Sequence, residues 1–194
     1  MPEVTEHLEK ITLTIHPLPA EALAAFTSCF EPFHIKKKQL LTTSGNKEKF
    51  LYFITEGVQR MYYLDDAARE ATILFTYPYS FGGVLDAFML QQPSKYFYET
   101  LSDSAFLRAS YTDLQKVRTD FPVIDSMLSK GLSAALSGVL ERLAEIQCLS
   151  AEEKLRKLFN RSPHVFQLIP QKYLANYLGI DATNFSKFMN NVRL

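Results

Sequence analysis

The stretch FPVIDSMLSKGLSAALSGVLERLAEIQCL, residues 121–149, decides the fold. Apolar side chains recur in it at steps of three or four residues, which places them on one stripe of a helix. The stripe consists of Phe121, Ile124, Leu128, Leu132, Ala135, Val139, Leu143 and Ile146. We therefore predict one long amphipathic helix, with no proline after Pro122 to interrupt it.

Two glycines, Gly131 and Gly138, lie seven residues apart in this helix, among alanines and serines. Each glycine costs a helix about 1 kcal/mol, whereas small side chains at heptad spacing let a second helix approach closely. A symmetric partner helix would justify that cost, so we expect a homodimer. The predicted interface is Ile124, Leu128, Leu132, Ala135, Val139, Leu143 and Ile146. The alternative is a helix that packs only on its own domain.

The composition is that of a globular chain. The 194 residues are 47% hydrophobic and 13% aromatic, which is ample for one large or two small cores. No run approaches eighteen apolar residues and the N-terminus is polar, so we expect no membrane span, no secretory signal and a cytoplasmic location. Cys29 and Cys148 are too few for a disulfide framework or a thiolate cluster, and we expect two buried thiols.

Before the long helix, residues 33–110 form short runs rich in aromatic and β-branched residues. Turn sequences such as SGN, TEG and DDAA separate the runs at about ten- to fifteen-residue intervals, a spacing that favours an antiparallel sandwich or barrel. Short helices are expected over residues 3–10, 19–30 and 111–118, the last capped by Ser110 or Thr112.

After the long helix, local signals predict a second, smaller unit. Ser150 and Glu153 form a capping box for a helix over residues 151–160. Residues 171–194 then read as helix, turn, helix, in which Gly179 supplies the turn and Asp181 caps the second helix. Because the sequence stops just past this helix, we expect any following wing to be missing and phosphate contacts to be few.

The segment from residue 151 to the end carries seven Lys/Arg against three Asp/Glu, a positive charge that suits a polyanion. Its last helix presents short polar side chains opposite its phenylalanines, and its N-terminal turns suit entry into a major groove. The predicted contacts to double-stranded DNA are Lys172, Ala182, Thr183, Asn184, Ser186, Lys187 and Asn190. The alternative is a helical hairpin that only packs.

Taken together, the short strands, the long helix and the helix-turn-helix resemble the Crp/Fnr family of bacterial transcription regulators. The resemblance spans nearly the whole chain. It rests on LYFITEGVQRMYYLD at 51–65, SFGGVLDAF at 80–88, QQPSKYFYETLSDSAFLRAS at 91–110 and QKYLANYLGI at 171–180. It implies an α+β fold with an antiparallel, jelly-roll-like double-stranded β-roll flanked by helices. The implied domains are a cyclic-nucleotide-binding-like sensor (1–118), a dimerisation helix (119–149) and a helix-turn-helix domain (150–194).

The resemblance implies that the loop at residues 81–88 begins a phosphate-binding cassette; we call it the cassette loop. Nucleotide-binding members place a Gly-Glu pair there, followed later by Arg and a small hydroxyl residue. The matching ligand positions in this chain are Gly82, Gly83, Val84, Ser94 and Lys95. Glycine and valine lack a side-chain acceptor, and lysine is a point charge rather than a bidentate fork. We therefore expect no cyclic AMP binding. The pocket either holds another small anion or is vestigial.

The sequence contains no motif that is typical of an enzyme. The four histidines are scattered, so we expect no metal, and there is no P-loop, nucleophile elbow or set of haem or iron–sulfur ligands to imply a cofactor. The sequence thus predicts a homodimeric, DNA-binding transcription regulator. In a second reading, the dimer uses its helix-turn-helix for a protein contact and its roll for a small molecule or partner. Salt dependence of DNA affinity separates the two.

Overall fold

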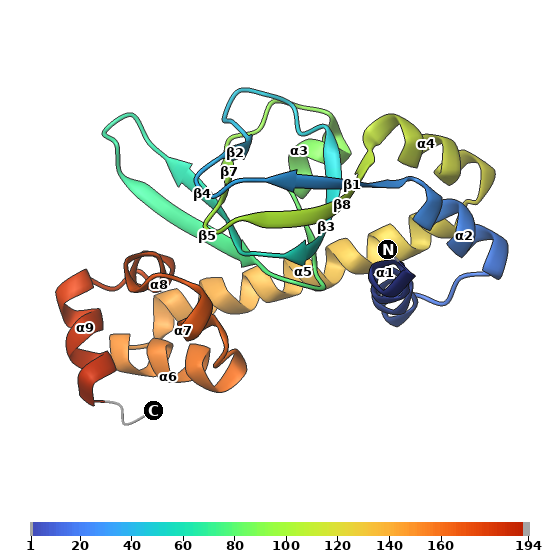
Figure 1. Ribbon diagram of the computed structural model, residues 1–194. Coiled ribbons are helices and arrows are strands. Elements are labelled where there is room, and N and C mark those ends of the chain that lie inside the picture. Colours follow the sequence, from blue (N-terminus) through green and yellow to red (C-terminus); the bar gives the residue numbers. More distant parts are fainter. Residues whose placement is uncertain (1, 192–194) are drawn as a thin grey trace.

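The computed structural model describes residues 2–191, and Figure 1 shows their arrangement. The chain begins with α1 (Pro2–Ile15) and α2 (Ala20–Ser28), close to the predicted helices. Pro19 lies at the N-cap of α2, one position before the predicted first turn, where its missing N–H leaves no helical hydrogen bond unmade. Phe26 of α2 is fully buried against the roll.

The middle of the chain forms the predicted antiparallel β-roll. One sheet has the strand order β1-β8-β3-β6 and the other β2-β7-β4-β5, and the paired strands are antiparallel. Helix α3 (Leu85–Leu90) follows β6. The strands are β1 (Phe30–Ile35), β2 (Leu40–Thr42), β3 (Phe50–Glu56), β4 (Gln59–Leu64), β5 (Glu70–Thr76), β6 (Phe81–Gly82), β7 (Phe97–Thr100) and β8 (Ser104–Ser110).

The interior of the roll is aromatic, with a short chain of polar groups through it. The Thr76 hydroxyl donates to Gln59 Oε1 at 2.8 Å and lies 2.7 Å from the hydroxyl of Tyr98. Gln59 Nε2 donates in turn to Ser104 Oγ at 2.9 Å. Each of these buried polar groups therefore has a partner, which removes most of the cost of burying it.

Helix α4 (Tyr111–Asp120) begins at Ser110, whose hydroxyl accepts from Asp113 N at 3.1 Å, so Ser110 rather than Thr112 is the cap. The long helix α5 (Val123–Cys148) follows, within one or two residues of its predicted ends. Figure 1 shows it running along one side of the roll, from α1 and α2 at one end to the C-terminal helices at the other. It joins the two parts of the chain as a single rigid rod.

Helix α5 is mostly open on the side away from the roll. Within residues 2–191 it is the one helix whose length and hydropathy would also let it cross a membrane, and 11% of that apolar window is buried in this chain. The search for unbroken apolar runs missed this property, because glycines, alanines and serines interrupt the leucines without lowering the mean hydropathy much. An exposed apolar face of this kind is typical of an interaction site.

The C-terminal helices begin and end where the local signals predict. Helix α6 (Ala151–Arg161) has the predicted capping box, in which Ser150 Oγ accepts from Glu153 N and the Glu153 carboxylate accepts from Ser150 N. A short helix α7 (Val165–Leu168), which was not predicted, leads to the helix-turn-helix of α8 (Gln171–Leu178) and α9 (Ala182–Asn191).

The turn between α8 and α9 has the predicted chemistry. Gly179 ends α8 in the left-handed conformation with a φ of 63°, which glycine adopts at little cost. Asp181 Oδ1 accepts from the backbone N of Thr183 at 2.9 Å and of Asn184 at 3.3 Å, and so caps α9. These two positions fix the angle between the helices.

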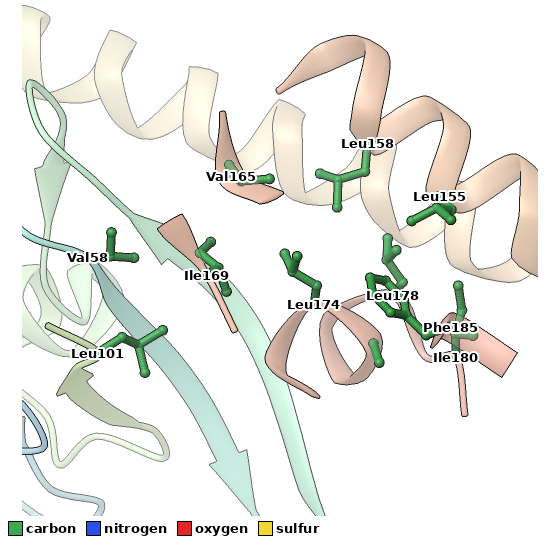
Figure 2. Close-up of a cluster of buried hydrophobic side chains, with 11 residues drawn as sticks. Val58, Leu101, Leu155, Leu158, Val165, Ile169, Leu174, Leu178, Ile180 and Phe185 are labelled. Carbon is green, nitrogen blue, oxygen red and sulfur yellow. The ribbon is translucent and has the colours of Figure 1, made fainter. Parts of the chain in front are cut away.

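The helix-turn-helix packs on the roll rather than hanging from α5. Its apolar core continues into Val58 and Leu101 of the roll. Figure 2 shows Ile169 between Val58 on one side and Leu174 of α8 on the other. Because one cluster spans both parts, burying its side chains also fixes the helix-turn-helix against the sensor.

A side-chain amide completes this contact at the free edge of β5. Asn176 Nδ2 donates to Glu70 O at 2.7 Å, and Asn176 Oδ1 accepts from Thr72 N at 2.6 Å. One side chain thus makes the pair of bonds that a neighbouring strand would make. It satisfies an edge that would otherwise be free to pair elsewhere.

Replacement of Asn176 by the similarly shaped leucine is expected to loosen this contact. Two backbone groups of β5 lose their partners, which should lower the free energy of unfolding by about 1–2 kcal/mol in denaturant titration. Hydrogen exchange at the Thr72 amide should become faster. Asn160→Leu, at an exposed position of α6, is the matched control. If hydrogen exchange at the Thr72 amide is unchanged in Asn176→Leu, Asn176 does not protect the edge of β5.

Candidate DNA-binding and effector sites

The outer face of α9 is exposed over its first two turns. Ala182, Thr183, Asn184, Ser186 and Lys187 are exposed, and between them the buried Phe185 anchors the helix to its own domain. The helix therefore presents a polar surface of short side chains with one cation, as predicted. Figure 1 places α9 at the end of the molecule, away from the strands of the roll.

Two further residues of the predicted DNA surface lie at its margins. Lys172, in the first turn of α8, is exposed, and its Nζ lies 4.5 Å from the centre of the Tyr173 ring. Asn190 belongs to α9, but its side chain lies outside the described part of the structure. Among the described residues, no carboxylate pairs with Lys172 or Lys187. Both cations are therefore available to phosphates.

The cassette loop is closed rather than open to a ligand. Gly82, Gly83 and Val84 are all buried. A Cβ on Gly82 would lie 2.5 Å from the Tyr98 hydroxyl, and a Cβ on Gly83, whose φ is +114°, would lie 3.2 Å from Phe50 O. The glycines thus permit close packing of the loop on the roll, where the cyclic-nucleotide binders of the resembled family have a ligand-contacting glutamate.

A buried carboxylate holds this loop from inside. Glu48 accepts from the backbone N of Val84 at 3.2 Å, of Lys49 at 3.0 Å and of Phe50 at 3.3 Å, and from the Thr42 hydroxyl. Burial raises the pKa of Glu48, and the hydrogen bonds from these donors oppose that rise. Sequence reasoning missed the role of this residue because Val84, the partner by which it holds the loop, lies 36 residues further along the chain.

The second half of the predicted ligand site lies elsewhere. Ser94 is buried, and its backbone N donates to Asn46 O at 2.8 Å while its hydroxyl donates to Tyr96 O at 2.8 Å. Lys95 is exposed and lines neither of the two cavities that the cassette loop borders. The structure therefore does not bring Lys95 together with Gly83 around a common cavity.

The two cavities beside the cassette loop differ in character. The first, of about 330 Å³, lies between α1, α3 and α5 and has an almost wholly apolar wall. The second, of about 630 Å³, lies between β5, the cassette loop, α5 and the C-terminal helices. The second contains two cations, Arg142 and Arg161, and falls in the size range of small-molecule sites.

Arg142 of α5 ties three elements together at this second cavity. Its guanidinium donates to Ile73 O, to Thr72 O at 3.0 Å and to Tyr177 O at 2.5 Å, and it lies 3.8 Å from the centre of the Tyr177 ring. Burial lowers the pKa of Arg142, because the charged form loses its hydration. Sequence reasoning missed Arg142, whose hydrogen-bond partners come from β5 and α8.

The exposed face of α5 is rotated from the predicted stripe. Ile124 is fully buried within its own chain, Leu128 packs against the same cluster, and Gly131 faces Ile15 of α1. Ile124 and Gly131 are thus explained by packing on the chain's own domain. Gly138 is exposed and borders the second cavity.

Four large apolar side chains dominate the exposed face: Leu136 is 58% exposed, Leu140 55%, Leu143 50% and Val139 43%. Leu136 and Leu140 were missing from the predicted set, although their spacing with Leu132 and Leu143 is also helical. Of the remaining predicted positions, Leu132 and Ile146 are half-buried and Ala135 is exposed, bordering both cavities.

The thiols and metal-binding residues form no site. Cys29 is half-buried and Cys148 is exposed, so the expectation of two buried thiols is wrong for Cys148, which lies in the last turn of α5. Within residues 2–191, no group of three or more His, Cys, Asp or Glu side chains is placed to hold a metal ion.

Glu48→Ala should destabilise the roll by about 3 kcal/mol in denaturant titration, because the buried Val84 N–H, the partly buried N–H groups of Lys49 and Phe50 and the Thr42 hydroxyl lose their acceptor. Glu48→Gln keeps one acceptor oxygen and should lower the free energy of unfolding by about 1 kcal/mol. The difference between the two variants is the diagnostic quantity. A loss from Glu48→Ala no larger than that from Glu48→Gln would show that the carboxylate does not hold the loop.

Neither a protein-family model nor a curated protein matches the sequence. Solved structures do match. The c-di-GMP responsive global regulator CLP of Xanthomonas campestris is 17% identical, with a TM-score of 0.69 over 90% of this chain and 92% of its own. FixK2 from Bradyrhizobium japonicum is 14% identical, with a TM-score of 0.71 over 84% of each chain.

A third match, assigned to the crp/fnr family of transcriptional regulators, comes from Eubacterium rectale. It is 14% identical, with a TM-score of 0.70 over 90% of this chain and 83% of its own. At these identities the likeness is one of fold. From its β-roll through the long helix to the helix-turn-helix, the chain has the fold of the Crp/Fnr regulators.

Proposed function

We propose that the protein is a cytoplasmic, homodimeric regulator of transcription that binds double-stranded DNA and catalyses no reaction. The observation that carries the proposal is the outer face of α9, which is exposed, polar and held rigidly by Gly179 and Asp181. A helix in this position, on a fold shared with transcription regulators, is suited to enter a major groove.

The side chains of α9 match the chemistry of base edges and phosphates. The side chains of Thr183 and Asn184 offer hydrogen-bond donors and acceptors close to the N-terminus of the helix. Lys187, one turn further on, meets guanine or a phosphate, and Lys172 on α8 holds a phosphate at the margin of the groove. Few phosphates are contacted, so affinity should depend on pairing two copies.

The exposed face of α5 provides that pairing. Leu136, Val139, Leu140 and Leu143 form an apolar stripe along a helix of 26 residues, which is about 39 Å long. A second copy of the same helix covers the stripe by two-fold symmetry, which presents the same residues from both sides. The two α9 helices then face successive major grooves, about 34 Å apart.

The sensor roll, in this proposal, does not bind cyclic AMP. The loop of Gly82 to Val84 is packed shut and its amide at Val84 is already bonded to Glu48. No side chain there can accept from a ribose hydroxyl. The roll instead holds the dimer helix and the helix-turn-helix at a defined angle, and an effector acts only if it favours one angle over another.

The test of function is selection of bound sites from a pool of random duplexes by the purified protein at two salt concentrations. A regulator retains a two-fold symmetric site, with half-sites one helical turn or a multiple apart, and loses affinity steeply as salt rises. Absence of any retained duplex at low salt would favour the second reading, in which the helix-turn-helix contacts a protein.

Lys187→Ala should weaken DNA binding and flatten its salt dependence. A dimer carries two copies of this lysine, so the slope of log K against log salt should become less negative by about 2. Lys36→Ala removes an exposed lysine of the roll, paired with Asp103, and should leave the slope unchanged. Equal slopes for Lys187→Ala and the unaltered protein would remove Lys187 from the DNA surface.

Leu140→Glu should weaken the dimer about 100-fold or more in sedimentation velocity, because symmetry places two buried carboxylates near each other. Leu90→Glu is the matched control, since Leu90 on α3 is 65% exposed and lies outside α5. A dimer of undiminished strength in Leu140→Glu would exclude this face as the interface.

A further inference from the structure

Arg60 on β4 is a buried cation of the β-roll that also contacts the helix-turn-helix. It is 3% exposed. Within the roll its guanidinium donates to both carboxylate oxygens of Glu70, at 2.5 and 2.9 Å, and to Glu99 at 2.5 Å. The guanidinium carbon lies 4.2 Å from the centre of the Tyr62 ring on the same strand and 4.1 Å from that of Tyr173 on α8. The roll supplies both carboxylates, and α8 supplies one of the two rings.

These contacts restrict the direction of approach as well as the distance. A guanidinium is planar, and its fork of donors meets a carboxylate in its own plane. Glu70 and Glu99 therefore orient the Arg60 guanidinium, and its orientation decides where an aromatic ring can lie against its face. Tyr173 belongs to the first turn of α8, so this contact orients the beginning of the helix on the roll.

The same network includes the next turn of α8. Glu70 pairs with Arg60 through its carboxylate, while its carbonyl accepts from Asn176 Nδ2 at 2.7 Å. The Thr72 hydroxyl lies 3.4 Å from Arg60 Nη1, and the backbone N of Thr72 donates to Asn176 Oδ1. Arg60 is thus connected through two residues of β5 to a second point on α8.

The free energy of folding alone does not account for an ion cluster at this boundary. Two carboxylates face one guanidinium, and the side chains of Glu70 and Glu99 are only 34% and 18% exposed. Buried ion pairs commonly add little to stability, because both charges lose their hydration. Apolar side chains of similar volume would also hold the two parts together, but they would leave the angle between them less defined. The directional contacts of Arg60 define that angle.

We propose that Arg60 is a positioning residue that restricts the dimer to one spacing of DNA half-sites. The proposal rests on the proposed function, because it takes α9 as the helix that enters the major groove. Two copies of α9 reach two half-sites only if each is held at the right angle. One additional base pair between the half-sites shifts one of them by about 3.4 Å and turns it by about 35° around the DNA axis. A fixed helix-turn-helix cannot follow this change, whereas a loosened one can.

The test uses Tyr173→Leu and Arg60→Gln in the full chain. A similar cluster that lies wholly within the roll provides the controls, because Arg108 is also ion-paired and lies 4.1 Å from the centre of the Phe33 ring. Phe33→Leu is the matched control for Tyr173→Leu, and Arg108→Gln is that for Arg60→Gln. Tyr173→Leu leaves Arg60 paired with both carboxylates of the roll, so this variant decides if Arg60→Gln does not fold.

The first measurement, made without DNA, is hydrogen exchange at the Thr72 amide, which donates to Asn176 of α8. Exchange should become about tenfold faster in Tyr173→Leu, because the beginning of α8 loses its contact with the roll. Phe33→Leu should exchange as the unaltered protein does. Unchanged exchange in Tyr173→Leu would overturn the proposal, whether or not the protein binds duplexes.

The second measurement compares affinity for the selected two-fold symmetric site with affinity for the same site lengthened by one base pair between its half-sites. The unaltered protein should bind the lengthened site about 100-fold more weakly, because one half-site is lost. In Tyr173→Leu and Arg60→Gln this ratio should fall to about tenfold. Both controls should keep the ratio of the unaltered protein, as would any variant that only lowers the amount of folded chain.

The two measurements separate the possible failures. If Thr72 exchange becomes faster but the ratio of affinities stays unchanged, Arg60 holds α8 without restricting the half-site spacing, and the proposal is wrong. If the unaltered protein retains no duplex, the proposed function and the spacing role fail together, while the exchange result still shows whether Arg60 holds α8 on the roll.

Discussion

The edge of strand β5 sets the position of the helix-turn-helix. An edge strand has free backbone groups, and here they are satisfied from two sides. The Asn176 amide of α8 hydrogen-bonds to the carbonyl of Glu70 and the N–H of Thr72. The Arg142 guanidinium of α5 donates to the carbonyls of Thr72 and Ile73. The β-roll, helix α5 and the helix-turn-helix therefore meet on a few consecutive peptide groups, and a shift of β5 moves all three.

The cassette loop is held in place by groups of the protein itself. The Glu48 carboxylate accepts a hydrogen bond from the backbone N–H of Val84. The Tyr98 hydroxyl fills the space beside Gly82. The loop is thus stabilised without any small molecule. A cavity lies beside the loop, between the roll, α5 and the helix-turn-helix, and Arg142 and Arg161 are among its lining residues.

Signals that act within a few residues could be predicted from the sequence, and those that act between distant segments could not. The capping box at Ser150, the left-handed Gly179 and the cap at Asp181 all lie where they were expected, because each depends on its own neighbours. The periodicity of α5 was also predicted correctly. Its orientation was predicted only in part. Val139 and Leu143 of the predicted interface are exposed, whereas Ile124 is buried in its own chain. Helix α5 carries two apolar stripes, and periodicity alone cannot say which of them meets the roll. The roles of Glu48 and Arg142 depend on partners far away in the sequence.

Under the proposed dimerisation, the open stripe on α5 also links the stability of the chain to its abundance. When a second copy covers Leu136 and Leu140, the free energy of association adds to that of folding, so dilution lowers the stability of the folded chain. At low copy number a larger share of chains would expose the stripe to proteases and to other apolar surfaces. The amount of protein in the cell would then itself control the fraction of chains that are folded and paired.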